Sequence, residues 1–231
     1  MIWGGMLRYD TAAFLFRILF LAGGALTAVF YCTEISIRRR PEFYILLVIS
    51  TLGMSLMAAA ADLILLFLSI ETASIPLYVM AGIKIKEAKS VEAGLKYFLF
   101  GAMSSAILVY GFSLLYGFAG TTQIYELASG VAGQNVPLAA LVIAIILVLS
   151  GFAFKVSAAP FHFWAPDVYE GAPTSVTGFL STVSKAAGFA ALMRILLILF
   201  AAEHAQVWQS LIAALAVASM FTGNLIAIPQ R

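Results

Sequence analysis

The sequence predicts an all-α integral membrane protein with about seven transmembrane helices. Of its 231 residues, 63% are hydrophobic and only 10% are charged, and the mean hydropathy is +1.03. A soluble domain is nearer half apolar and a quarter charged. The apolar residues also gather in runs of about 20, the length that a helix needs to cross ~30 Å of hydrocarbon.

The first three apolar runs predict helices over Thr11–Cys32, Glu42–Ala61 and Leu63–Ile83. The second and third runs abut at Ala61 and Asp62, so we expect them to form a tight helical hairpin. Arg17 interrupts the first run about two turns from its end, where a long side chain can snorkel to the interface.

The other four runs predict spans over Glu92–Phe118, Pro137–Ala159, Thr174–Ala201 and Val207–Ile228. Between the fourth and fifth spans, the stretch Ala119–Val136 is more polar, with several glycines and two threonines, and we expect a loop there.

Basic residues define an orientation. If every span crosses once, only Arg8 counts on one side of the membrane. Because short cytoplasmic loops carry an excess of Lys and Arg, the basic side is expected in the cytoplasm or its topological equivalent, and the N-terminus outside. The residues of the basic side are Arg38, Arg39, Arg40, Lys84, Lys86, Lys89 and Arg231.

Several function classes are excluded. The single cysteine, Cys32, rules out an intrachain disulfide and a cysteine-based metal site. His162 and His204 fall on different segments and form no metal motif. The net charge of +2, without a basic arm, gives no indication of nucleic-acid binding. No phosphate-binding loop or haem motif is present, so we expect no electron carrier in this chain.

Four charged residues inside the expected spans are the informative exceptions. A charge at the bilayer centre costs at least ~2.5–3.5 kcal/mol on insertion scales, so such residues mark proton or ion paths by default. Lys96 also has a plainer interpretation, a snorkelling lysine paired with Glu92 four residues earlier. Arg194, near a span end, is interpreted as snorkelling. The four candidates are Glu71, Lys96, Lys155 and Lys185.

Proline predicts a broken helix beside Lys155. Pro160 cannot donate to the carbonyl of Val156, so the fifth span should lose regular helix between Lys155 and Pro160. His162 follows directly, either as a proton relay to water or as an interfacial hydrogen-bonding residue. Asp167 and Glu170 are expected to be loop and cap residues rather than proton carriers.

Five segments together resemble a known family. They are Ser69–Leu77, Glu92–Tyr97, Gly151–Pro173, Phe179–Lys185 and Gly223–Leu225. Their sequences closely resemble the subunit N (subunit 2) family of NADH-quinone oxidoreductase, the respiratory complex I. The resemblance runs from about Thr11 to the last residue.

The resemblance implies an antiporter-like fold of two inverted five-helix repeats, each with one broken helix. Lys155 matches the lysine of the broken helix in the first repeat, and Lys185 matches the central lysine. Glu71 and Lys96 match a glutamate–lysine pair, so Glu71 is expected to hold Lys96 charged. Loss of that pairing would send a proton toward Lys155 and Lys185.

The family has roughly fourteen helices, so we expect this chain to be a fragment that holds the first repeat only. Residues 1–41 would form a leading helix and cytoplasmic loop, 42–202 the five-helix repeat, and 203–231 the first helix of a truncated second repeat. The charged residue of the second repeat is not in this sequence.

The resemblance implies a proton-translocating membrane subunit of a complex I-type NAD(P)H or ferredoxin:quinone oxidoreductase. Quinone, FMN and iron–sulfur clusters would lie with partner subunits, and this chain would hold no cofactor. Its partners would be other membrane subunits and the lipid of the inner (plasma) membrane, or of a thylakoid if the gene is plastid-encoded.

Two alternatives stay open. One is a subunit of a multisubunit Na⁺/H⁺ antiporter. The sequence of Asp167–Pro173 argues against this alternative. The other is a structural scaffold that pumps nothing.

Overall fold

The computed structural model describes residues 2–34, 41–133, 136–199 and 205–228, which are almost entirely helical. Arg38, Arg39, Arg40, His204 and Arg231 lie outside these residues. The helices are α1 (Thr11–Thr33), α2 (Pro41–Ala59), α3 (Leu63–Ala81), α4 (Ala88–Ala119), α5 (Ile124–Gly133), α6 (Leu138–Val156), α7 (Ala165–Gly171), α8 (Thr174–Ser181), α9 (Val183–Arg194), the π-helix η1 (Ile195–Leu199) and α10 (Ala205–Ala227).

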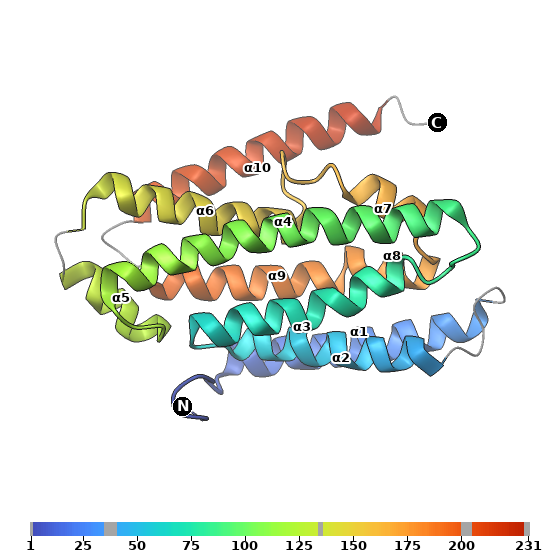
Figure 1. The fold of residues 1–231 in the computed structure, drawn as a ribbon, viewed down its shortest axis with the longest axis horizontal. Helices are drawn as coiled ribbons and strands as arrows, with labels where there is room; N and C mark the ends of the chain where they lie inside the picture. Colours follow the sequence, from blue (N-terminus) through green and yellow to red (C-terminus); the bar gives the residue numbers. More distant parts are fainter. Residues whose placement is uncertain (1, 35–40, 134–135, 200–204, 229–231) are drawn as a thin grey trace.

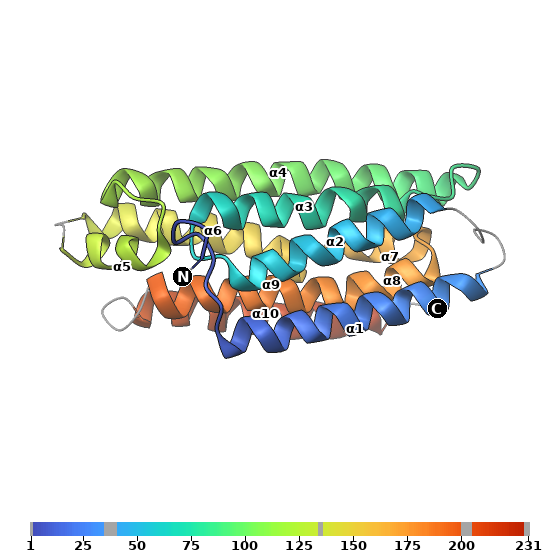
Figure 2. The same cartoon turned by 90° about the horizontal axis from the view of Figure 1, so that it is seen from below.

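The long helices lie side by side as an elongated bundle (Figures 1 and 2). Among the described residues, seven helical stretches are long and apolar enough to cross a membrane, which confirms the predicted span count. The α3–α4 connection lies at one end of the bundle, together with the last turn of α1 and the first turn of α2. The N-terminus and α5 lie at the opposite end (Figure 1).

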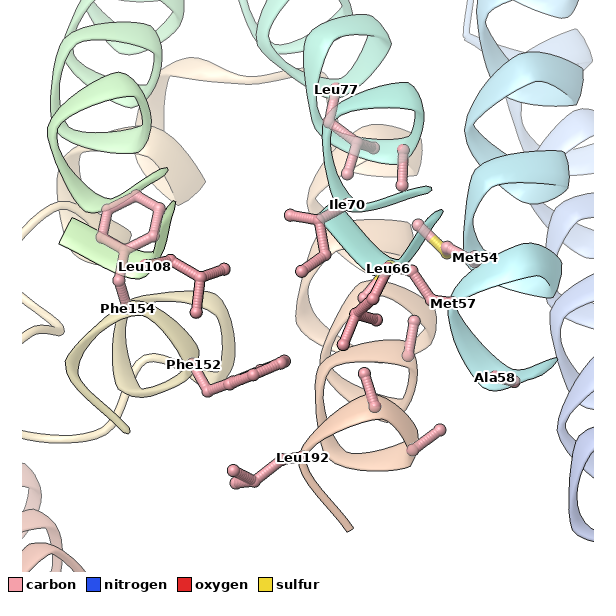
Figure 3. Packing of buried hydrophobic residues seen from close by; sticks show 14 of the residues in the cluster. Met54, Met57, Ala58, Leu66, Ile70, Leu77, Leu108, Phe152, Phe154 and Leu192 are labelled. Carbon is pink, nitrogen blue, oxygen red and sulfur yellow. The ribbon is translucent and has the colours of Figure 1, made fainter. Parts of the chain in front are cut away.

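The core is apolar and lies between α2, α3, α4, α6 and α9 (Figure 3). Met54 and Met57 on α2 face Leu66 on α3, while Ile70 lies on the side of α3 toward Leu108 of α4 and Phe152 of α6 (Figure 3). Because lipid is as apolar as these side chains, close packing rather than apolar burial holds such helices together.

The expected hairpin of α2 and α3 is present and tightly packed. A Cβ on Gly53 would lie 2.4 Å from the backbone nitrogen of Ala73, so only glycine permits this approach. Asp62 caps α3 by accepting hydrogen bonds from the backbone N–H groups of Ile64 at 2.8 Å and Leu65 at 3.1 Å.

The loop expected over Ala119–Val136 is only partly correct, because it contains α5. Gly120 ends α4 with a φ of +69°, and the chain then turns back over the end of the bundle. The buried side chains of Ile124 and Leu127, three residues apart, hold α5 on the core. Two apolar residues among polar neighbours are too weak a signal to distinguish a short helix from a loop.

The predicted break beside Lys155 is confirmed. Helix α6 ends at Val156, and Ser157 takes a left-handed conformation with a φ of +58°. The backbone N–H of Ala158 donates to the carbonyl of Ala153 at 2.8 Å, a bond typical of a helix C-terminus. The chain then runs through Pro160 to the short helix α7 (Figure 1).

The sixth span, expected as one helix over Thr174–Ala201, is also interrupted. Thr182 separates α8 from α9 with φ −115° and ψ −73°. Its hydroxyl donates to the carbonyl of Gly178 at 2.6 Å. Hydroxyl side chains offer the backbone an alternative partner in this way, and no proline marks the position in the sequence.

The interpretation of Arg194 as a snorkelling residue is wrong. Its side chain is buried at the end of α9, where it donates to the carbonyl of Ala58 at 2.7 and 3.1 Å. It also forms an ion pair with Asp10, the N-cap of α1, at 3.0 Å, and lies 3.4 Å from the hydroxyl of Tyr125 on α5. One cation therefore joins α1, α2, α5 and α9.

The orientation can be tested with single cysteines in a Cys32→Ser background. Lys86 and Ser129 are exposed at opposite ends of the bundle. We expect a membrane-impermeant maleimide to label Ser129→Cys on intact cells, and Lys86→Cys only after permeabilisation, because of the Lys/Arg asymmetry. Labelling of both variants from the same side would contradict this topology.

Replacing Arg194 should destabilise the bundle. Arg194→Met removes hydrogen bonds from a buried cation, each worth about 1.5–3 kcal/mol. A net loss of ~2 kcal/mol would lower Tm by roughly 4–8 °C for a chain of this size. The matched control is Arg8→Gln, because Arg8 is more exposed and its ion pair with Asp10 spans 3.7 Å. Equal melting temperatures for the two variants in detergent would show that Arg194 holds nothing together.

Candidate proton-transfer site

Lys155 is buried at the interrupted end of α6. Only 6% of its surface is exposed, and its ammonium donates to the hydroxyl of Ser74 on α3 at 2.7 Å. No carboxylate in the described part of the chain lies within ion-pair distance of it. Its partner is thus a neutral hydroxyl, which can both donate and accept a proton.

Lys185 lies in the first turn of α9, directly after the break at Thr182. Its ammonium hydrogen-bonds the hydroxyl of Ser157 and lies 3.5 Å from the carbonyl oxygen of Lys155. It also faces the ring of Trp164, 4.5 Å from the ring centre, as a cation–π contact. The break in α6 therefore supplies both oxygen atoms that contact Lys185.

Glu71 lies in the middle of α3 and is partly buried. Its carboxylate accepts a hydrogen bond of 2.5 Å from the hydroxyl of Ser105 on α4. Ser74, the partner of Lys155, follows three residues later on the same helix and so lies on the same face. The structure thus links Lys155 to α3 through Ser74 and Lys185 to the carbonyl of Lys155, and Glu71 lies one turn before Ser74 on α3.

The expected pairing of Glu71 with Lys96 is wrong. Lys96 forms ion pairs with Glu92 at 2.6 Å and with Asp167 of α7 at 2.5 Å, and 37% of its side chain is exposed. Ser105, which holds Glu71, comes nine positions later on α4, about 14 Å along the helix axis. The pairing with Glu92 agrees with the plainer interpretation of Lys96. Asp167 lies in the first turn of α7 rather than in a loop, and it is an ion-pair partner of Lys96.

His162 lies in the turn between α6 and α7. Its Nδ1 atom is buried and has no hydrogen-bond partner among the described residues. The structure does not join it by a hydrogen bond to either buried lysine, so its role as a relay stays a prediction.

The serine hydroxyls that contact Glu71, Lys155 and Lys185 were not singled out from the sequence. Ser74 and Ser105 lie on spans where many serines only bond their own helix. Ser157 lies two residues after Lys155 in the sequence, but its contact with Lys185 depends on how α9 packs against α6. Gly188 permits that packing, since a Cβ there would lie 3.2 Å from Cγ of Lys155.

A cavity of about 280 Å³ adjoins the break and lies between α6, α9 and α10. Ser157 and Ala158 line one wall, and Ser219 of α10 lines the other. The hydroxyl of Ser219 accepts a hydrogen bond of 2.9 Å from the backbone N–H of Ala159. Polar atoms thus border this cavity beside the partner of Lys185, as a site for water requires.

The described residues hold no group of three or more His, Cys, Asp or Glu side chains that could bind a metal ion. The side chains described above for this site are lysine ammonium groups, a carboxylate and hydroxyls, which can hold and pass protons.

Interrupted helices with buried lysines are typical of antiporter-like membrane proteins. Residues 60–231 match the family model described as NADH:quinone oxidoreductase/Mrp antiporter, TM, so the chain belongs to this family. The prediction of an antiporter-like membrane fold is confirmed.

The chain is similar to NADH-quinone oxidoreductase subunit N of Moorella thermoacetica, with 49% identity over 93% of this chain and 45% of the relative. The protein of the same name from Trichlorobacter lovleyi is 47% identical over 96% of this chain and 46% of its own length. Among solved structures, a chain of respiratory complex I from Thermus thermophilus with bound Aureothin matches with a TM-score of 0.79 and 35% identity, covering 99% of this chain and 49% of the other. The chain thus spans about half the length of the curated relatives it matches.

Proposed function

We propose that this chain carries protons across the membrane as part of a complex I-type quinone oxidoreductase. The observation that supports this most directly is that each buried lysine hydrogen-bonds a neutral hydroxyl: Lys155 bonds Ser74, and Lys185 bonds Ser157 at the break in α6. The similarity to subunit N relatives supports the assignment to this kind of enzyme.

The two buried lysines suit proton transfer because their nearest partners are neutral. A carboxylate in ion-pair contact would favour the charged form of a lysine. Lys155 and Lys185 instead contact hydroxyls and a carbonyl oxygen. Each can therefore release its proton when a neighbouring charge changes, and a serine hydroxyl can pass it on.

Lys96 acts, in this proposal, at the entrance of the path. Its ion pairs with Glu92 and Asp167 lie at the end of the bundle that carries Lys84–Lys89. Asp167 lies on the short helix α7, so a movement of α7 would remove one of the two carboxylates that pair with Lys96 and make its proton easier to release. His162, in the turn just before α7, would exchange protons with water.

Electron transfer belongs, in this proposal, to partner subunits that oxidise NADH or ferredoxin and hold FMN, iron–sulfur clusters and quinone. Other membrane subunits are its neighbours, and the bacterial relatives support a location in the plasma membrane. Residues 42–202 would form the first antiporter-like repeat, preceded by the leading segment 1–41 and followed at 203–231 by the start of the second repeat.

A Na⁺/H⁺ antiporter subunit is the second candidate, because the matching family model covers both kinds of protein. The two are separated by the driving reaction. A quinone oxidoreductase acidifies vesicles when NADH and quinone are supplied, whereas an antiporter moves protons in response to a sodium gradient without any electron donor.

Lys185→Ala should lower proton pumping roughly tenfold or more, since a positioned proton carrier contributes at least this much. Lys185→Arg should not restore pumping, because arginine keeps its proton in a protein. The measurement is acidification and quinone reduction in membrane vesicles, normalised to the amount of assembled protein. Lys86→Ala is the matched control, as Lys86 is an exposed lysine outside the path. Pumping by Lys185→Ala at the level of Lys86→Ala would place the path elsewhere.

Ser157→Ala should also reduce pumping several-fold, since it removes the hydroxyl that hydrogen-bonds Lys185 in the described part of the chain. Ser157→Gly should behave in the same way, while its backbone accepts the positive φ without strain. Ser150→Ala is the control, because that hydroxyl bonds only the carbonyl of Ile146 in its own helix. Normal pumping by both Ser157 variants would remove the hydroxyl from the path.

A further inference from the structure

A groove of about 560 Å³ lies between α1 and α2 at the edge of the bundle. The hydroxyls of Thr51 and Ser55 in its wall donate to carbonyls of their own helix at 2.8 and 2.9 Å, so they offer no free proton to a ligand. The rest of the wall is largely apolar and includes Leu21, Ala25, Ala28, Leu47, Val48 and Leu52.

The groove follows the central part of α1. Arg17 lines one end, and Ala28 and Tyr44 line the other. Arg17 and Ala28 are eleven positions apart on α1, about 16 Å along the axis. Because α1 runs from Thr11 to Thr33, the groove begins about 9 Å from the start of the helix, and an acyl chain lying in it would extend toward the centre of the span.

The end at Arg17 carries a cation without a carboxylate partner. The guanidinium lies 5.8 Å from the centre of the Tyr9 ring, so the side chain reaches toward the start of α1 and the membrane surface, as a snorkelling arginine does. No carboxylate among the described residues lies within ion-pair distance of it, whereas Arg8 and Arg194 share Asp10.

We propose that this groove binds one acyl chain of an anionic phospholipid, whose phosphate pairs with Arg17 in the leaflet on the N-terminal side. Two properties select this occupant: an apolar groove that runs along the membrane-spanning part of α1, and a cation without a carboxylate partner at the end nearer the membrane surface. A cation at the membrane surface favours anionic over zwitterionic lipid. A helix of a partner subunit would fill the apolar groove equally well but would need a carboxylate at the Arg17 end.

The test uses protein extracted in mild detergent with its native partners and returned to phosphatidylcholine vesicles. The vesicles carry a trace of photoactivatable phosphatidylglycerol or, in parallel, photoactivatable phosphatidylcholine. We expect cross-links on the α1 and α2 peptides to favour phosphatidylglycerol roughly fivefold, and Arg17→Lys to keep most of this preference. Arg17→Gln should remove the preference while leaving some labelling by both lipids.

Groove filling separates acyl binding from charge attraction. Ala25→Trp should abolish labelling of α1 and α2 by both probes, because Ala25 lines the groove. Ala22→Trp is the matched control, since Ala22 is exposed on the same helix but does not line the groove. The proposal is overturned by equal labelling from both lipids in the unaltered protein, by a preference that survives Arg17→Gln, or by no labelling at all, which would mean that a partner helix covers the groove.

Discussion

Hydrocarbon offers no hydrogen bonds, so every interrupted helix inside a membrane must satisfy its backbone within the protein. Two interruptions meet in this bundle, one after Val156 and one at Thr182. Their free groups find partners locally, as when Ala159 donates to the hydroxyl of Ser219. The carbonyl of Lys155 lies 3.5 Å from the ammonium of Lys185. A backbone carbonyl at the break in α6 therefore also helps to position the ammonium group of Lys185.

Helix α9 carries two buried or partly buried cations whose surroundings differ. Arg194, which is always charged, has a carboxylate, a helix C-terminal carbonyl and a tyrosine hydroxyl that satisfy its guanidinium and fix its position. Lys185 has a hydroxyl, a carbonyl and an aromatic ring. A lysine ammonium can release a proton, and these neutral partners suit either of its protonation states. Arg194 thus anchors α9 at one end of the bundle, whereas Lys185, in the first turn of the same helix, is a titratable group inside the bundle.

Small residues decide how closely these helices approach. A Cβ on Gly94 of α4 would lie 2.9 Å from the Cα of Gly82, and one on Gly53 would meet the backbone of α3. Such contacts are what associate helices in lipid, where burial of apolar side chains provides little. They also set the rotation of α3 and α4, and so place Glu71 beside Ser105 and leave Lys96 facing α7.

The sequence by itself determined the seven spans and the break before Pro160, because span length and the missing proline N–H act locally along the chain. It also identified the intramembrane charges, since their insertion cost depends on neighbours in sequence. Only the tertiary structure decided which groups meet. The partners of Glu71 and Lys96, the buried network of Arg194, the helix α5 and the break at Thr182 depend on how helices rotate and pack against one another. That lateral packing is set by contacts between residues far apart in the chain, so the spacing of residues along a single helix carries no record of it.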